Sequence, residues 1–316
     1  MSPAPSTAGT LIFLQGTGGP DPVPSQTIRE QLALEPDLAG YTVLNVAWAA
    51  GAGRDISVVP ALPPRYRGNA GAVRPGPDGE RGLAMAGMDL LRSATAPWPP
   101  DSRTGTAPEA DAADAEERLL AGGVQRLVLG LVTDAAVNRR VPLTAAASDF
   151  SRSIIYYLSR GREARSVIAN ALRMSDPDAP VILFGHSLGG VAAVDLLSGP
   201  EWDAAGMRVD LLVTAGSQSP WLYLLGGLAH LGPGKPGNVP VPWLNFWDER
   251  DLLSFCAEEV FSGSGAAVRD VEIASGDPFP ASHSAYFTDP ALYRAISEGM
   301  SAADQAWGRS GPDAGV

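Results

Sequence analysis

The chain of 316 residues has very little cysteine and very little lysine. Cys256 is its only cysteine, so an internal disulfide or a cysteine-based metal site cannot form. Lys235 is its only lysine, and the 35 acidic residues exceed the 23 Lys and Arg residues, for a formal net charge of −12. This balance argues against a nucleic-acid partner, because a nucleic-acid groove needs a basic patch to neutralise phosphates.

Long apolar runs are also missing. No uninterrupted apolar stretch approaches the roughly 20 residues that span a bilayer, so we expect no transmembrane segment. Near the N-terminus, Leu11–Leu14 is apolar but too short for the core of a signal peptide, and no basic region precedes it. We therefore expect a cytoplasmic protein, with export by a route without a cleaved leader left open.

The chain does contain 45% hydrophobic residues, enough for a large core. Short apolar runs rich in β-branched and aromatic residues predict buried strands. These runs are Thr10–Gly16, Tyr41–Ala49, Pro180–His186, Val209–Gly216, Val241–Trp247 and Val268–Ala274. Helical stretches lie between them, and one of these, Asp149–Met174, is either a single helix interrupted near Gly161 or two short helices. Strands that alternate with helices indicate an α/β fold, with a mostly parallel sheet covered by helices on both faces.

Between about residues 60 and 117 this pattern dissolves into Pro, Gly, Ala and charged residues. Such a composition predicts a loop-like insert, which is either a flexible surface segment or a lid over a site. No linker separates two domains and no internal repeat is visible. We predict a single domain over residues 1–316 that carries this insert and has a frayed tail after residue 301.

Val181–Leu197 joins a strand-like run to a helix-like run through a glycine-rich corner. Gly185, Ser187 and Gly189 fit the pattern G-x-S-x-G in this corner. The serine must occupy a strained turn that lifts its hydroxyl above the sheet edge, and the flanking glycines leave room for that turn. The same backbone aims the amide of Leu188 at the place where an oxyanion would form. We predict a nucleophilic serine at Ser187, the alternative being an ordinary strand-to-helix turn.

With its corner sequence GHSLGG, the chain resembles the α/β-hydrolase superfamily, whose lipases and esterases have a similar elbow. The resemblance extends from Thr10 to about Met300, apart from the insert. It implies an α/β-hydrolase fold and a serine nucleophile, a catalytic acid and a histidine in that chain order. Because the chain begins almost at the strand before the oxyanion loop, the resemblance also implies that the family's first two strands are absent.

A serine hydroxyl needs a nearby base to take its proton, and histidine suits this task because its reference pKa is about 6.5. His186 adjoins Ser187 and is expected to point elsewhere, as a packing or supporting residue. His230 precedes any plausible acid. His283 follows the last predicted strand, where the family's histidine loop lies, and HSAYF is similar to a common lipase sequence. We predict His283 as the base, the alternative being a solvated loop histidine.

The acid should follow the penultimate strand, where it orients the imidazole and stabilises its cation. Asp248, Glu249 and Asp251 lie there. Asp251 precedes two leucines and resembles the family's acid turn best, although the usual proline is missing. We predict Asp251 as the acid and keep Asp248 as the alternative, with the other residue capping the turn or pairing with Arg250.

The loop after the first strand reads LQGTGG and resembles the family's oxyanion loop, with Gln15 in place of the usual histidine. Thr17 holds the position whose amide usually serves, and Gly18 could share that task with it. Leu188 would supply the other amide of the oxyanion hole. A phosphate-binding loop is the alternative, but the segment lacks the lysine–serine ending of a P-loop and the spacing of a dinucleotide fingerprint.

Together these residues predict a serine hydrolase that cleaves carboxylic esters through an acyl-enzyme intermediate. A small-molecule or lipid-like acyl ester would be the substrate. The stretch Trp221–Leu231 could line an acyl pocket or form a lipid-facing cap, and this stretch and the insert both favour a lipid-like or medium-chain acyl group. Thioesterase, amidase or phospholipase activity with the same residues stays open, as does an inactive hydrolase fold that binds a partner. The sequence implies no cofactor and no metal site, and leaves the oligomeric state open.

Two polar side chains outside this set are assigned structural roles. Asp195 is expected on the solvated side of the helix that follows Ser187. Cys256 is expected to be a buried apolar filler rather than a reactive thiol.

Overall fold

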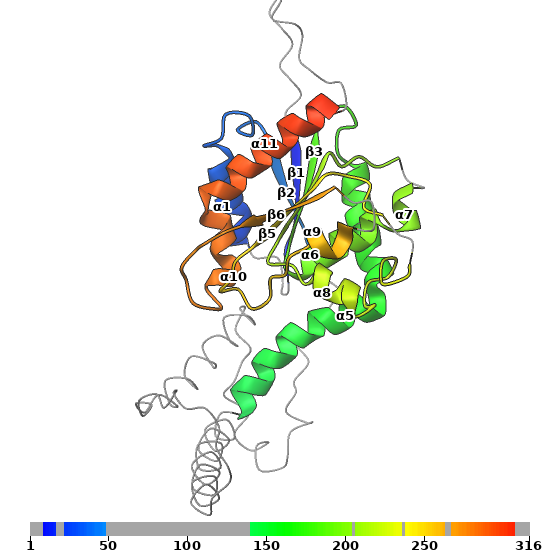
Figure 1. Ribbon diagram of the computed structural model, residues 1–316, viewed down its shortest axis with the longest axis vertical. Coiled ribbons are helices and arrows are strands. Elements are labelled where there is room, and N and C mark those ends of the chain that lie inside the picture. The colour runs from blue at the N-terminus through cyan, green and yellow to red at the C-terminus, as the bar shows by residue number, and fades with distance from the viewer. Residues whose placement is uncertain are drawn as a thin grey trace, which may run out of the picture. The chain divides into compact units, whose positions relative to one another are not determined.

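The computed structural model describes residues 9–16, 22–48, 140–203, 206–235, 238–262 and 267–306 (Figure 1). Of residues 22, 140–153 and 303–306 only the backbone is described. The chain divides into two compact units. One unit comprises Met1–Asp55 and Asp149–Val316 and holds all the described strands. Of the other unit, Ile56–Ser148, the described residues are the first residues of one helix. The predicted insert at residues 60–117 lies outside the described residues.

A six-stranded sheet forms the centre of the first unit (Figure 1). Its strands are β1 Thr10–Leu14, β2 Thr42–Val46, β3 Val181–His186, β4 Leu211–Ala215, β5 Trp243–Trp247 and β6 Val268–Glu272. Their order is β2-β1-β3-β4-β5-β6, and every neighbouring pair is parallel. All six predicted strands are therefore confirmed. The inner strands β3 and β4 are buried at every residue, which is why they appear in the sequence as unbroken apolar runs.

Helices cover both faces of the sheet, as predicted (Figure 1). One face packs against α1 Pro22–Leu32, α10 Ser282–Ala285, the 3₁₀ turn η4 Tyr286–Thr288 and α11 Pro290–Ala306. The other packs against α5 Arg140–Arg173, α6 Leu188–Leu197, α7 Pro200–Asp203, α8 Ser219–Leu224 and α9 Glu258–Phe261. The fold thus buries one apolar core on each side of the sheet.

Helix α5 is interrupted at Arg160, whose backbone angles of φ −131° and ψ 24° are not helical. This confirms the interruption predicted near Gly161. The helix begins at Arg140, earlier than the sequence pattern predicted. At the other end of the chain, α11 continues to Ala306, so the residues directly after position 301 are helical.

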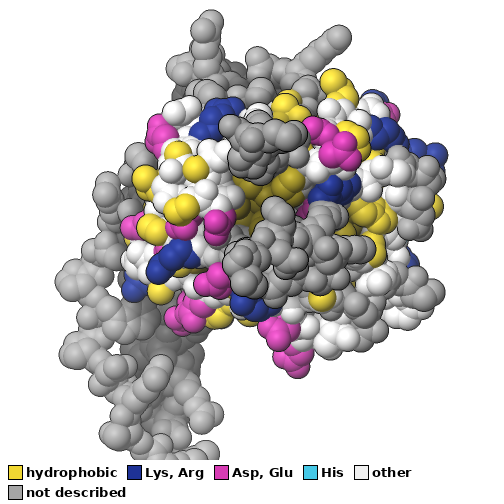
Figure 2. Space-filling view, turned by 90° about the horizontal axis from the view of Figure 1, so that it is seen from above, with side chains coloured by type: hydrophobic (Ala, Val, Ile, Leu, Met, Phe, Trp, Pro, Cys, Tyr) yellow, Lys and Arg dark blue, Asp and Glu magenta, His cyan; other side chains and the backbone are white. Residues whose placement is uncertain are grey.

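The surface carries charges of both signs. Figure 2 shows a face on which acidic and basic side chains lie among hydrophobic ones. Among the helices of the described ranges, none is both long enough and apolar enough to cross a membrane.

We expect the removal of a buried aromatic side chain from β3 to lower the stability of the fold strongly. Phe184 is fully buried, with its ring centroid 5.4 Å from that of Phe13 and 6.2 Å from that of Phe287. We expect Phe184→Ala to lower the free energy of unfolding by about 3–5 kcal/mol, because the cavity cannot refill. Leu224→Ala, at a side chain that is 58% exposed, should change it by less than about 0.5 kcal/mol. Urea unfolding followed by circular dichroism measures both, and equal losses would contradict the assigned core.

Candidate active site

Ser187 lies between the last residue of β3 and the first residue of α6, where the backbone turns sharply. Its backbone angles are φ 55° and ψ −127°, and it is the one non-glycine residue with positive φ in the described ranges. A side chain in this conformation costs about 1–3 kcal/mol, and such strain persists only where the surrounding structure enforces it. The corner has the strained geometry that the sequence motif predicted.

Neighbouring glycines make this corner possible. A Cβ atom at Gly185 would lie 2.6 Å from the backbone of Gly190, and one at Gly189 would collide with the carbonyl oxygen of Leu14. A Cβ at Gly16 would lie 2.8 Å from Cβ of Ser187. The loop that follows β1 therefore passes directly against the serine, without room for a side chain between them.

His283 in α10 and Asp251 in the loop after β5 form a buried pair. Because a carboxylate only accepts, Nδ1–H of His283 donates to Asp251, at 2.9 Å from Oδ2 and 3.0 Å from Oδ1. A Cβ at Gly216 would lie 3.0 Å from this imidazole ring. Gly216 follows Ala215, whose carbonyl oxygen accepts the N–H of Ser187 at 2.9 Å. The imidazole therefore lies beside the serine corner, at the carboxyl ends of β3 and β4.

Asp251 receives two further hydrogen bonds. The hydroxyl of Tyr286 donates to Oδ2 at 2.8 Å, and the N–H of Leu253 donates to Oδ1 at 3.0 Å. Burial by itself raises the pKa of Asp251, but the hydrogen bond and charge of His283, together with these two donors, lower it below its ordinary value. Asp251 is thus held as an anion. Burial and the Asp251 charge raise the pKa of Tyr286, which keeps its hydroxyl protonated as a donor.

Asp248, the alternative acid, has different partners. Its Oδ1 accepts the N–H of Arg250 at 2.7 Å, and its Oδ2 accepts the N–H of Ser275 at 3.1 Å and the hydroxyl of Ser275. It caps the turn after β5 and connects that turn to the loop after β6. Of the two carboxylates that the sequence left open, the structure brings Asp251 to His283.

His186 is buried next to His283. Its Nε2–H donates to the carbonyl oxygen of His283 at 2.7 Å, and the two rings lie 4.6 Å apart between centroids. Burial, and then the charge of His283, lower the pKa of His186 to about 3. His186 is therefore neutral near pH 7 and supports the backbone of His283, in line with the supporting role expected for it.

A parallel sheet with helices on both faces, and a strained serine corner at the end of its third strand, together define the architecture. The fold is α/β-hydrolase-like. No protein-family profile matches the sequence, and no curated protein matches it.

Two solved structures match this chain at low similarity. A Xanthomonas campestris protein described as a hydrolase of the alpha/beta superfamily is 16% identical, with a TM-score of 0.35 over 93% of this chain and 99% of its own. A cutinase-like protein from Cryptococcus sp. is 15% identical, with a TM-score of 0.28 over 96% of this chain and 97% of its own. Since both TM-scores lie below 0.5, neither neighbour identifies the reaction of this chain.

Two predicted site residues fall outside the described residues, and sequence reasoning missed one residue that lies beside Ser187. The two outside are Thr17 and Gly18, so the second oxyanion donor stays a prediction. Gln218 was missed. Its Nε2 donates to the carbonyl oxygens of Gly216 and Leu253, each at 2.8 Å, and lies 3.5 Å from Oγ of Ser187. Its place just after β4 was the available signal, because the carboxyl ends of parallel strands meet at one sheet edge.

The prediction that Asp195 faces solvent is wrong. Every residue of α6 is buried, so this helix has no solvated side. Asp195 instead accepts hydrogen bonds from the Tyr157 hydroxyl at 2.6 Å and from the N–H of Ala229 at 2.8 Å. Burial is the largest effect on its carboxyl and raises the pKa of Asp195.

The prediction that Cys256 is buried is also wrong. The residue lies in the loop between β5 and α9, outside both cores, and is exposed. Partial burial and the charges of Asp270 and Glu272 raise the pKa of its thiol. A raised pKa disfavours the thiolate, which is the reactive form.

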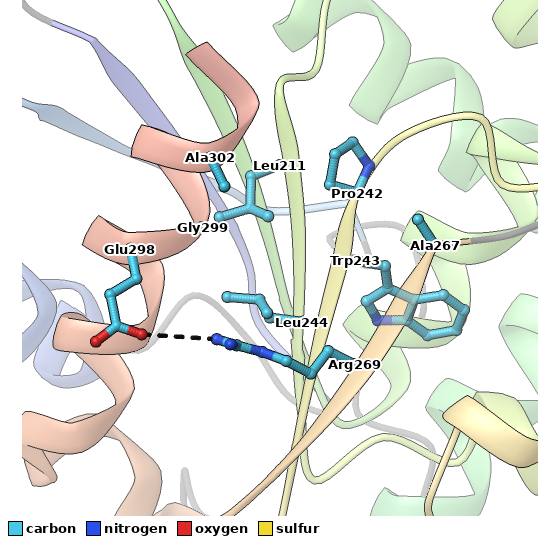
Figure 3. Close-up of a pocket in the computed structure, with 9 residues that line it drawn as sticks. All are labelled: Leu211, Pro242, Trp243, Leu244, Ala267, Arg269, Glu298, Gly299 and Ala302. Carbon is cyan, nitrogen blue, oxygen red and sulfur yellow. Dashed lines mark ion pairs between the residues drawn. The ribbon is translucent and has the colours of Figure 1, made fainter. Parts of the chain in front are cut away.

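A separate cavity of about 270 Å³ lies at the opposite end of the sheet (Figure 3). Leu211 and Trp243, which line it, begin β4 and β5, whereas Ser187 follows the end of β3. Arg269 and Glu298 form an ion pair there at 3.9 Å. This cavity contains none of the residues around Ser187. Nor do any three His, Cys, Asp or Glu side chains of the described ranges lie close enough together to hold a metal ion.

The buried His186 predicts a loss of stability in acid. Unfolded histidine accepts a proton near pH 6.5, whereas folded His186 resists it down to about pH 3. Between these values the unfolded chain binds one more proton, so His186 contributes stability that is present above pH 6.5 and lost as pH falls. Between pH 5 and 4, the free energy of unfolding should fall about 1.4 kcal/mol per pH unit more steeply in wild type than in His186→Asn. Urea unfolding across this range measures the difference, and parallel curves would contradict it.

Proposed function

We propose that the chain is a serine hydrolase that cleaves carboxylic esters through an acyl-enzyme intermediate. The observation that carries the proposal is the convergence of the strained Ser187 corner with the buried His283–Asp251 pair at one edge of the sheet. A hydroxyl, an imidazole and a carboxylate in this order form the set that activates a serine in acyl transfer.

In this mechanism Ser187 attacks the ester carbonyl while His283 takes the proton of its hydroxyl. Nδ1 of His283 carries the hydrogen that binds Asp251, which leaves Nε2 as the accepting nitrogen of the neutral ring. The anion of Asp251 stabilises the imidazolium that forms. His283 then gives the proton to the leaving alkoxide, and a water molecule, activated by the same imidazole, releases the acid from Ser187.

The oxyanion that forms on attack needs donors fixed in advance. Leu188 is the first residue of α6, and the first N–H groups of a helix have no acceptor within the helix. Its amide is one donor in our proposal. Thr17, with Gly18 beside it, supplies the second. The close approach of Gly16 to Ser187 supports this choice, because Thr17 is the next residue along the same loop.

We propose a lipid-like or medium-chain acyl group as the substrate's apolar part. Helix α8 follows Gln218 directly, and Trp221 and Leu224 on it are about half exposed, at 48% and 58%. A thioester, an amide or a phospholipid could undergo cleavage by the same residues. An inactive hydrolase fold that binds a partner is the second candidate, and covalent labelling distinguishes it.

A fluorophosphonate probe should label wild type and leave Ser187→Ala unlabelled, because phosphonylation needs an activated hydroxyl. Ser198→Ala is the matched control, since this serine lies just after the same helix and its hydroxyl bonds the carbonyl oxygen of Val194. It should be labelled like wild type. In-gel fluorescence measures all three proteins. Equal labelling of Ser187→Ala, or no labelling of wild type, would overturn the proposal.

The two neighbouring carboxylates offer a matched pair of variants. Asp251→Asn should lower kcat for p-nitrophenyl butyrate by about 10⁴-fold, because an amide no longer holds the imidazole in the productive tautomer. Asp248→Asn should cause a far smaller loss, since Asp248 bonds backbone and Ser275 rather than His283. Initial rates at pH 8 measure both. If the two losses are reversed, Asp248 is the acid.

A further inference from the structure

An indole group holds the loop that passes Ser187. Trp48 follows β2, is 2% exposed, and donates its Nε1–H to the carbonyl oxygen of Gln15 at 2.8 Å. Gln15 is the first residue after β1, and thus begins the loop that reaches the serine. The bond connects two segments that are 33 residues apart in the chain.

The orientation of this carbonyl matters because the peptide group is planar. The carbonyl of Gln15 and the N–H of Gly16 belong to one peptide, so holding the oxygen also fixes the direction of that N–H. A Cβ at Gly16 would lie 2.8 Å from Cβ and 3.3 Å from Oγ of Ser187. Any rotation of this peptide therefore displaces backbone that touches the serine, and redirects the chain toward Thr17.

The indole of Trp48 is held in place by packing against a second aromatic ring. Its ring meets the ring of Tyr157 edge to face, at 5.8 Å between centroids and 89° between planes. The Tyr157 hydroxyl donates to Asp195 at 2.6 Å. Asp195 lies on α6, the helix that begins directly after Ser187. The loop and the serine are thus connected to the same helix by a chain of buried contacts.

We propose that Trp48 is a positioning residue for acyl transfer: its indole N–H orients the Gln15–Gly16 peptide against Ser187, and so sets the course of the backbone that enters the proposed oxyanion loop. Tyr157 and Asp195 hold the indole in this position. The inference rests on the proposed serine hydrolase activity. It adds a residue that positions the site without belonging to the triad of Ser187, His283 and Asp251.

Trp48→Phe tests this role, with Trp243→Phe as the matched control in the full chain. Trp243 is equally buried, and its indole N–H donates to a side chain, Thr214 Oγ1, at 2.8 Å, rather than to the loop after β1. Trp48→Phe should lower kcat for p-nitrophenyl butyrate by about 10- to 100-fold and leave KM within about twofold, because misplaced donors weaken binding of the transition state alone. Trp243→Phe should leave kcat within about twofold of wild type, even where its thermal stability falls equally.

A boronic acid, whose oxygen imitates the oxyanion, supplies an independent measurement. Its inhibition constant should weaken in Trp48→Phe by the same factor as kcat/KM. If Trp48→Phe does not fold, 3-benzothienylalanine at position 48 keeps the shape of the indole but lacks its N–H, and should give the same kinetic loss.

Three results would overturn the role of Trp48. These are an equal kcat loss in both tryptophan variants, a loss confined to KM, or unchanged boronic-acid affinity. Wild type that a fluorophosphonate leaves unlabelled would overturn the hydrolase proposal itself, and this outcome is distinct because wild type retains Trp48.

Discussion

The strained backbone at Ser187 is the constraint on which the remainder of the site depends. A positive φ at a serine is unfavourable by about 1–3 kcal/mol, so neighbouring contacts must hold it. The carbonyl of Ala215 accepts the N–H of Ser187 at 2.9 Å, and the carbonyl of Ser187 accepts the N–H of Gly190 at 3.0 Å. Parallel pairing keeps β1, β3 and β4 in register, so the loop after β1, the serine and Gly216 arrive together at one sheet edge. The strain is therefore sustained by the sheet rather than by the turn alone.

Two histidines lie in contact at this edge, and their hydrogen bonds give them different chemistry. The Nε2–H of His186 donates to the carbonyl oxygen of His283, and the pKa of His186 is lowered to about 3. His186 therefore stays neutral and supports the backbone of His283. The Nδ1–H of His283 donates to the carboxylate of Asp251, and this negative charge stabilises the ring when it gains a second proton. In the proposed mechanism only the second histidine can act as the base, because a cation on His186 would be buried without a carboxylate partner. In the proposed mechanism, therefore, His186 supports the backbone and His283 transfers the proton.

The sequence predicted those features that depend on local pattern. The six strands are apolar runs because buried parallel strands face helices on both sides, and the corner followed from three glycines around Ser187. The sequence favoured Asp251 as the acid but left Asp248 as an alternative, because both lie in one turn and only the position of His283 distinguishes them. Asp195 was misplaced for a related reason. A single acidic residue in a helix indicates a solvated side unless its partner is known, and Tyr157 lies 38 residues away.

The buried polar groups behind the site have an energetic cost that their geometry offsets. Burial raises the pKa of Asp195, and the hydrogen bonds that its carboxylate accepts from the Tyr157 hydroxyl and the Ala229 N–H offset the cost of burying it. A satisfied network of this kind permits one arrangement and disfavours the alternatives. Because Trp48 packs on Tyr157 and binds Gln15, the same network determines where the loop beside Ser187 lies. Donors placed in this way need no reorganisation when charge develops, so part of the catalytic power of the proposed hydrolase would be established during folding, before any ester binds.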